Sequence, residues 1–254
     1  VADAPHFDPY FRREGLLERE EFFQRMGLNP QKKLITYTTV PQTTCDYQGD
    51  FIAIILEAIE GGALGPAQLL VRLHPQDESG AYVRFRSTPG LVFDLPGRYT
   101  RQFDSAPASL KAMFWDPSLK DVLHLGDTML RSDVVICIAS TITIEASIFD
   151  TPVINLAFDG YRERPYYNSL LRYYDYTHYK NVTVSGGAAV VKSREEFSGA
   201  LAAYIKEPSL HREGRRKIIT GQCAFDDGDS ARRVAGCALD FMDSAGSLFT
   251  PQLA

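Results

Sequence analysis

The chain has 254 residues, of which 44% are apolar and 23% are charged. This is an ordinary globular composition, with enough apolar side chains for one substantial core. The formal net charge of -5 argues against a non-specific nucleic-acid binder, because such proteins usually carry a basic excess. The sequence contains no run near the roughly 20 apolar residues that a membrane-spanning helix needs.

The four cysteines, Cys45, Cys137, Cys223 and Cys237, form no CxxC pair. Their spacing supports neither a zinc site nor a disulfide framework. A reducing environment is therefore expected, and with it a cytoplasmic protein, attached to the inner face of a membrane if at all. The sequence starts at Val1, so we treat it as a fragment of a longer protein.

Residues 1–30 predict an interdomain linker that leads into a helix near Glu18–Met26, which ends at Gly27. Six short apolar runs follow, and they predict strands over Leu34–Val40, Gln68–Leu73, Leu91–Asp94, Val134–Ala139, Pro152–Ala157 and Ala188–Val191. The intervening and closing segments predict helices over Phe51–Ile59, Pro117–Arg131, Thr141–Phe149, Glu195–Ile205, His211–Gln222 and Ala231–Met242.

Strands that alternate with helices and read as continuous apolar runs are typical of a parallel sheet covered on both faces. About six such strands predict one α/β domain, a doubly wound, Rossmann-like parallel sheet. We assign this domain to residues 31–245 and a tail to residues 246–254. In such a sheet, ligands bind beyond the carboxyl ends of the strands, so candidate site residues are those that follow each strand.

After the fourth strand, Ser140 occupies a predicted helix N-cap position. The free amides of the first helical turn, with the hydroxyls of Ser140 and Thr141, predict an anion site suited to a pyrophosphate. Glu145 lies four residues beyond Thr141, on the same helix face about one turn deeper. Its carboxylate could accept hydrogen bonds from the hydroxyls of a ribose, and the alternative is a solvent-exposed glutamate.

After the second strand, alternation places Arg72 and His74 on the same side, and Pro75 ends the strand. A cation and a ring N–H at this edge suit a phosphate oxygen or a sugar hydroxyl. The loop after the first strand, which includes Thr39, carries neither a dinucleotide fingerprint nor a Walker motif. Its hydroxyls could still face the ligand, although a plain turn explains them as well.

Three further groups have a structural and a functional interpretation. Tyrosines crowd residues 166–179 around His178; they could stack a base or a sugar, or form a domain interface, and His178 could donate a hydrogen bond near the cleft. Asp229 is most simply a helix N-cap. A basic run is most simply a solvated helix face and otherwise a ligand patch; it comprises Arg212, Arg215, Arg216 and Lys217.

In their order and spacing, several segments resemble the CDP-glycerol glycerophosphotransferase-like enzymes and related GT-B bacterial surface-polysaccharide transferases. The resemblance covers nearly the whole chain through Pro5–Asp8, Lys32–Thr39, Leu70–Pro75, Gly126–Asp133, Ser140–Thr141, Glu145–Ala146, Pro152–Ile154 and Asp227–Val234. It implies the C-terminal, donor-binding half of a GT-B architecture.

The resemblance also implies a function. The chain would hold a nucleotide-diphosphate donor of the UDP or CDP type, for transfer of a sugar or a polyol phosphate in surface-polysaccharide synthesis. Ser140 and Thr141 would contact the pyrophosphate, His74 a donor phosphate and Glu145 the ribose, without a metal or another cofactor. The acceptor saccharide or polyol, and the catalytic residues, would belong to an N-terminal domain, without which we expect no catalysis.

Two alternatives stay open. The segment Arg162–Pro165 resembles an Arg-Pro motif of non-hydrolysing UDP-N-acetylglucosamine 2-epimerases, although the serine-glycine-glycine turn of that group is absent at Ser140–Ile142. A non-catalytic binding module on the same fold is the other alternative, because a fold alone does not determine a function.

Overall fold

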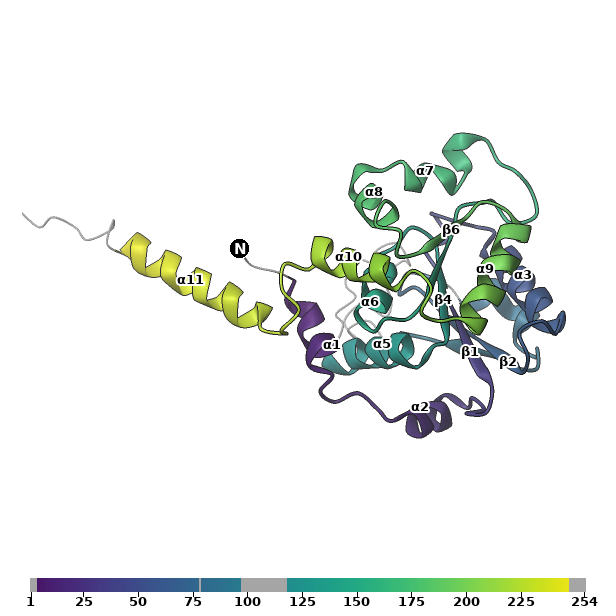
Figure 1. Ribbon diagram of the computed structural model, residues 1–254, viewed down its shortest axis with the longest axis horizontal. Coiled ribbons are helices and arrows are strands. Elements are labelled where there is room, and N and C mark those ends of the chain that lie inside the picture. Colours follow the sequence, from purple (N-terminus) through teal and green to yellow (C-terminus); the bar gives the residue numbers. More distant parts are fainter. Residues whose placement is uncertain (1–3, 78, 97–117, 247–254) are drawn as a thin grey trace, which may run out of the picture.

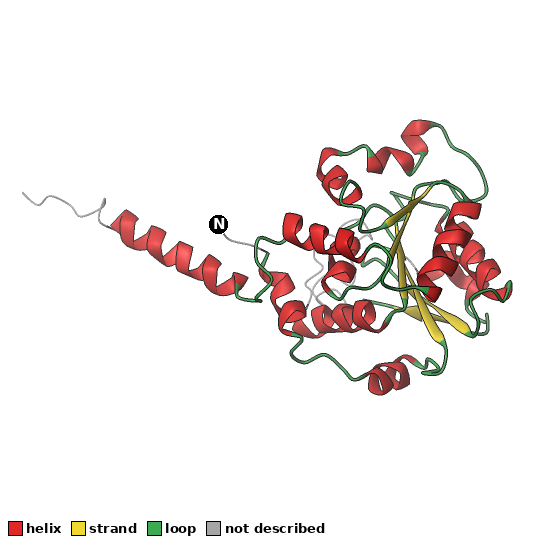
Figure 2. Cartoon of the chain, viewed as in Figure 1, coloured by secondary structure: helices red, strands yellow, loops and turns green. Residues whose placement is uncertain are grey.

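A computed structural model describes residues 4–77, 79–96 and 118–246 of the chain and shows a six-stranded parallel sheet covered by helices on both faces (Figures 1 and 2). The strand order is β3-β2-β1-β4-β5-β6, and every neighbouring pair is parallel. The strands are β1 (Lys33–Thr38), β2 (Ala67–Arg72), β3 (Leu91–Asp94), β4 (Val134–Cys137), β5 (Val153–Leu156) and β6 (Ala189–Val191). All six predicted strands and the predicted Rossmann-like class are confirmed.

Alternating side chains of the central strands enter two different cores. In β4, Val134 and Ile136 pack on one face, whereas Val135 and Cys137 pack on the other. The first face is covered by α3 (Gln48–Glu60) and α9 (Arg194–Lys206). Because both faces of a central strand are buried, its sequence reads as a continuous apolar run.

The second face is covered by α5 (Leu119–Arg131), α6 (Ile142–Ile148) and α10 (Arg212–Gln222), which lie on the opposite side of the sheet from α3 and α9 (Figure 1). Helix α5 begins at a capping box in which Ser118 and Asp121 satisfy each other's backbone N–H groups. A third, smaller core packs α2 (Arg19–Met26) against Leu34 and Leu70 of the sheet.

The described part of the expected linker, residues 4–18, packs against the domain through α1 (Asp8–Arg12). Tyr10 is buried and its hydroxyl donates to the Val122 carbonyl oxygen at 3.1 Å. The carboxylate of Asp8 accepts hydrogen bonds from the backbone N–H groups of Ser230 and Ala231, at 3.0 and 2.8 Å. The segment around Asp8 therefore contacts the segment around Ser230.

Helix α11 (Ser230–Gly246) projects away from the rest of the molecule (Figure 1). Its exposed apolar side chains include Leu239, Phe241 and Met242. Most of the predicted tail, residues 247–254, lies outside the described residues, as do residues 1–3.

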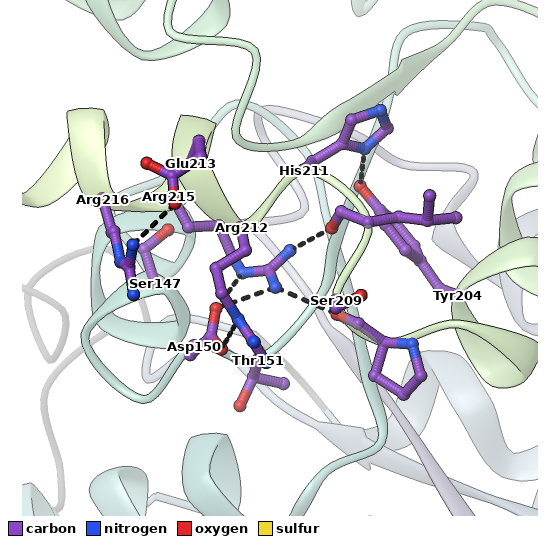
Figure 3. A network of polar contacts seen from close by, with 12 residues as sticks. Ser147, Asp150, Thr151, Tyr204, Ser209, His211, Arg212, Glu213, Arg215 and Arg216 are labelled. Carbon is purple, nitrogen blue, oxygen red and sulfur yellow. Dashed lines mark hydrogen bonds and ion pairs between the residues drawn. The ribbon is translucent and has the colours of Figure 1, made fainter.

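The basic run on α10 is not simply a solvated face, which corrects the sequence interpretation. Arg215 is only 1% exposed, and its guanidinium hydrogen-bonds Asp150 together with the carbonyl oxygens of Leu210 and Pro208 (Figure 3). Arg212 also binds Asp150, at 2.6 Å. Basic residues at helical spacing can belong to opposite faces, and one of these faces packs against α6.

The tyrosine-rich segment folds into η5 (Tyr166–Asn168), α7 (Leu171–Tyr174) and α8 (Thr177–Thr183). A further 3₁₀ helix, η2, covers Ser79–Phe85, and η1 covers Pro5–Phe7. These short elements were not predicted, because they lack an amphipathic repeat long enough to be visible in the sequence.

Candidate functional site

A cavity of about 340 Å³ lies at the carboxyl edge of the sheet, on both sides of the switch between β1 and β4. Six residues that the sequence analysis selected from three separate loops line this one cavity: Thr39, Arg72, His74, Ser140, Thr141 and Glu145. Their convergence follows from the parallel order β2-β1-β4, which brings the ends of these strands side by side. A crevice at a switch point is the usual ligand site of this fold.

Glu145 is the least satisfied group of the cavity. Its side chain, in the first turn of α6, is buried, and its Oε2 atom has no hydrogen-bond partner in the described part of the chain. Burial raises its pKa to about 7, although the nearby Arg72 charge opposes the shift. A buried carboxylate without a donor is costly, so it calls for a ligand hydroxyl or another donor.

His74 presents a neutral imidazole to the cavity. Its backbone N–H donates to Thr39 Oγ1 at 2.8 Å, which ties the loops after β1 and β2 together. Its Nδ1 accepts from the Gln76 backbone N–H at 3.1 Å, so the neutral ring carries its proton on Nε2. Burial lowers the His74 pKa, with Asp77 opposing. A neutral N–H donor is suited to a phosphate or hydroxyl oxygen.

Arg72 lines the cavity, but its charge already has partners. Its guanidinium pairs with Asp94 at the end of β3, and Asp94 Oδ1 lies 2.9 Å from His124 Nε2 on α5. Hydrogen bonds and charge from His124 and Arg72 outweigh burial and hold the Asp94 pKa below its ordinary value. Asp94 and His124 were not among the predicted site residues, although the position of Asp94 at a strand end was a usable signal.

The turn after β4 differs in detail from the predicted N-cap. Helix α6 begins at Ile142 with Thr141 as its N-cap residue, one residue later than expected. The Ser140 hydroxyl accepts the Ile142 N–H at 3.3 Å, and the Ser140 carbonyl oxygen accepts the Thr143 N–H at 3.1 Å. Fewer amides are therefore open than the sequence suggested, and the hydroxyls of Ser140 and Thr141 become the more important donors of this turn.

His178 does not line the cavity; it lies on α8 and is exposed beside Tyr176. The tyrosines around it divide into two sets. Tyr179 is buried, and its hydroxyl hydrogen-bonds Thr143 and Asn155 beneath the turn after β4. Tyr167, in contrast, is 79% exposed. The segment thus packs some rings beneath the turn after β4 and presents others to solvent.

In the described ranges, no group of three or more His, Cys, Asp or Glu side chains is arranged to hold a metal ion. Within the same ranges, no helix is both long and apolar enough to cross a bilayer. The donors that line the cavity include the hydroxyls of Ser140 and Thr141 and the ring of His74.

No family model and no curated protein matches the chain. Solved structures do match. Against the wall teichoic acid polymerase TagF, the TM-score is 0.59 at 17% identity, over 98% of this chain and 52% of that one. Against UDP-GlcNAc 2-epimerase from Neisseria meningitidis bound to UDP-GlcNAc, the TM-score is 0.58 at 12% identity, over 94% of this chain and 55% of that one.

The chain has the Rossmann-like fold of a GT-B C-terminal domain. The resemblance seen in the sequence is confirmed at this level. The chain spans about half the length of the structures that it matches. At these sequence identities the likeness shows the fold alone, because one fold can carry many different functions.

Proposed function

We propose that the cavity holds the nucleotide diphosphate of a glycosyltransferase donor. The observation that carries this proposal is the unpartnered Glu145 carboxylate, which lines the same cavity as the hydroxyls of Ser140 and Thr141 and the ring of His74. A carboxylate suits the ribose hydroxyls because it only accepts hydrogen bonds, whereas the other three groups can donate to phosphate oxygens.

The volume of the cavity also supports the proposal. A volume of about 340 Å³ falls at the lower end of the range for small-molecule sites. The paired Arg72 contributes positive potential at one end without offering a free guanidinium. In this proposal the phosphates lie near His74 and Ser140, and the ribose lies near Glu145. The nucleotide would be of the UDP or CDP type.

The transferred group would be a sugar or a polyol phosphate, passed to an acceptor saccharide or polyol bound by a further domain. Two of the matched structures are consistent with such donors, since one TagF structure was obtained with CDPG and the epimerase is bound to UDP-GlcNAc. Catalysis would then need residues that this half does not supply.

Isothermal titration of the chain with UDP, CDP and GDP tests the proposal. We expect one of the first two to bind with one-to-one stoichiometry, and the double variant Ser140→Ala, Glu145→Ala to lose binding while it keeps its circular dichroism spectrum. A matched control is Ser198→Ala with Glu196→Ala on α9, away from the cavity. Absence of heat with all three nucleotides would disprove the proposal.

An epimerase is the second candidate, because the epimerase structure matches as closely as the polymerase. This candidate is tested with the chain joined to its natural neighbouring sequence. Incubation with UDP-N-acetylglucosamine would produce the C2 epimer, visible by proton NMR. Nucleotide binding without an epimeric product would leave transfer as the supported function.

A further inference from the structure

Two adjoining polar cavities lie apart from the donor cavity, between the loop after β1 and the loop after β5. Their volumes are about 550 and 330 Å³, and they share Gln42, Asp46, Tyr47 and Arg164. Neither shares a lining residue with the donor cavity. The sequence segment Arg162–Pro165, to which the donor cavity gives no role, supplies part of their wall.

Arginines dominate the charge of these cavities. Arg84 and Arg162 line the first, Arg172 lines the second, and Arg164 lines both. The carboxylates that line them are Asp46 and Asp50. Four guanidinium groups and two carboxylates therefore line the cavities. Two further carboxylates, those of Asp77 and Asp159, accept hydrogen bonds from lining residues.

Two of these guanidinium groups, those of Arg164 and Arg172, are only partly satisfied. The terminal nitrogens of Arg172 donate to the Tyr167 carbonyl oxygen and to the Tyr173 hydroxyl. In the described residues, the Nε atoms of Arg164 and Arg172 are buried and have no hydrogen-bond partner. The nearest carboxylate contact of Arg164 is a long one, 3.9 Å to the exposed Asp46. An arginine fork with unused donors is suited to the oxygens of a phosphate group, which it can bind with two parallel hydrogen bonds.

The arginines are also held in place before any ligand arrives. The Arg164 guanidinium stacks on the Tyr47 ring, 3.8 Å from its centroid. Asp159, directly after β5, accepts hydrogen bonds from the Tyr47 hydroxyl at 2.8 Å and from the Arg164 backbone N–H at 3.2 Å. One buried carboxylate thus fixes both the ring and the arginine above it.

The first cavity also lies at the amino end of α3, a helix of 13 residues. No side chain caps this end in the part of the chain that the structure describes. Arg84 lies so close to the Gly49 backbone there that an added Cβ would come within 2.8 Å of its Nη2 atom. The helix dipole adds to the positive potential of the arginines.

We infer that these cavities form a second site, which binds a phosphate group belonging to a ligand other than the nucleotide. The four arginines supply the donors, and Asp159 with Tyr47 keeps Arg164 in position. Such a group has two possible sources. One is a phosphorylated acceptor, and the other is an effector, which would be free phosphate or a phosphate ester. The phosphate chemistry is common to both.

The test uses the whole chain and inorganic phosphate, followed through the arginine Nε–Hε resonances in nitrogen-proton NMR spectra. We expect the Arg164 and Arg172 signals to shift in a saturable way. Arg164→Gln should weaken phosphate binding about tenfold or more, because one charge-assisted pair is lost. Arg84→Gln provides a second variant should Arg164→Gln not fold, and Arg216→Gln, exposed on α10, is the control for net charge.

Saturating UDP or CDP and the Glu145→Gln variant separate this inference from the proposed function. We expect phosphate affinity to be unchanged by either, whether or not the donor cavity binds a nucleotide. Phosphate binding that is lost in Arg164→Gln but displaced by the nucleotide would show one continuous site and overturn the inference. Absence of a shift at Arg164 and Arg172, or equal weakening by Arg216→Gln, would also overturn it.

Repeating the titration with a phosphorylated sugar identifies the source of the phosphate group. Tighter binding of the sugar than of free phosphate indicates an acceptor, and equal binding indicates an effector.

Discussion

The Glu145 carboxyl is buried beside a cavity, in a place where ionisation is costly. Its pKa is raised from 4.5 to about 7 by burial, so the folded state binds this proton more tightly than the unfolded state does. The free energy of unfolding therefore falls as the pH rises from the unfolded pKa through the folded one, and the full penalty is present above about pH 7.

Glu145→Gln should remove this penalty. We expect the variant to gain stability relative to the original chain between pH 5 and pH 8, by on the order of 2 kcal/mol from linkage alone. Urea unfolding of both proteins at the two pH values measures the difference. An equal difference at pH 5 and pH 8 would contradict a raised Glu145 pKa.

Asp150 and Arg215 form an ion pair that does not line the cavity. Arg215 is almost fully buried, and Asp150 adopts a left-handed backbone conformation at φ 58°. Asparagine tolerates this conformation, so Asp150→Asn removes the charge without adding backbone strain. The buried guanidinium then loses its counter-ion, and we expect a loss of about 2 kcal/mol, reduced because Asp150 is partly exposed.

Chemical denaturation of Asp150→Asn measures that loss. The control is Glu213→Gln, which breaks the exposed pair between Glu213 and Arg216 and should change stability by no more than about 0.5 kcal/mol. Similar effects of the two substitutions would contradict a stabilising role for the buried pair of Asp150 and Arg215.

At the scale of elements, the start of α11 depends on the other end of the described chain. Asp229 precedes the helix as the sequence predicted, but the carboxylate that accepts the first-turn N–H groups belongs to Asp8. Gly228, at φ 73°, allows the approach, since a Cβ there would lie 3.0 Å from the Asp8 carbonyl oxygen. The motif Asp227–Val234 and the segment Pro5–Asp8 are thus two parts of one structural contact.

Asp8→Ala should therefore fray α11. Removal of a capping carboxylate costs about 1 kcal/mol, and the amides of Ser230 and Ala231 should exchange faster with solvent. Hydrogen exchange followed by NMR measures this effect, with the amides of β1 as the internal reference. Unchanged exchange at Ser230 and Ala231 would contradict capping by Asp8.

At the scale of the whole molecule, strand identity was predictable because both faces of the sheet are buried. Val134–Ala139 reads as a short apolar run rich in β-branched residues, and its length and composition favour a buried strand over a helix. The convergence of Thr39, His74 and Glu145 was predictable for a related reason. Strand ends of a parallel sheet share one edge, so residues placed after each strand meet there.

What could not be predicted is how these side chains pair with residues elsewhere. The guanidinium of Arg72 pairs with one carboxylate oxygen of Asp94, and the other oxygen of Asp94 lies beside His124. The place of Asp94 at the end of β3 indicates which edge of the sheet it occupies. No local pattern, however, predicts that it pairs with Arg72 and His124, which come from distant parts of the sequence. The position of His178 outside the cavity could not be predicted either. A local cluster of aromatic residues does not determine which face of a short helix is buried.

The most direct test of the central claim is to locate a bound nucleotide diphosphate. Amide NMR spectra recorded during a titration with CDP and with UDP report on every described loop at once. We predict saturable shifts in residues 39–40, 73–76 and 140–146, and their loss in the Ser140→Ala, Glu145→Ala variant. Shifts confined to other loops, or none with either nucleotide, would contradict donor binding at this cavity.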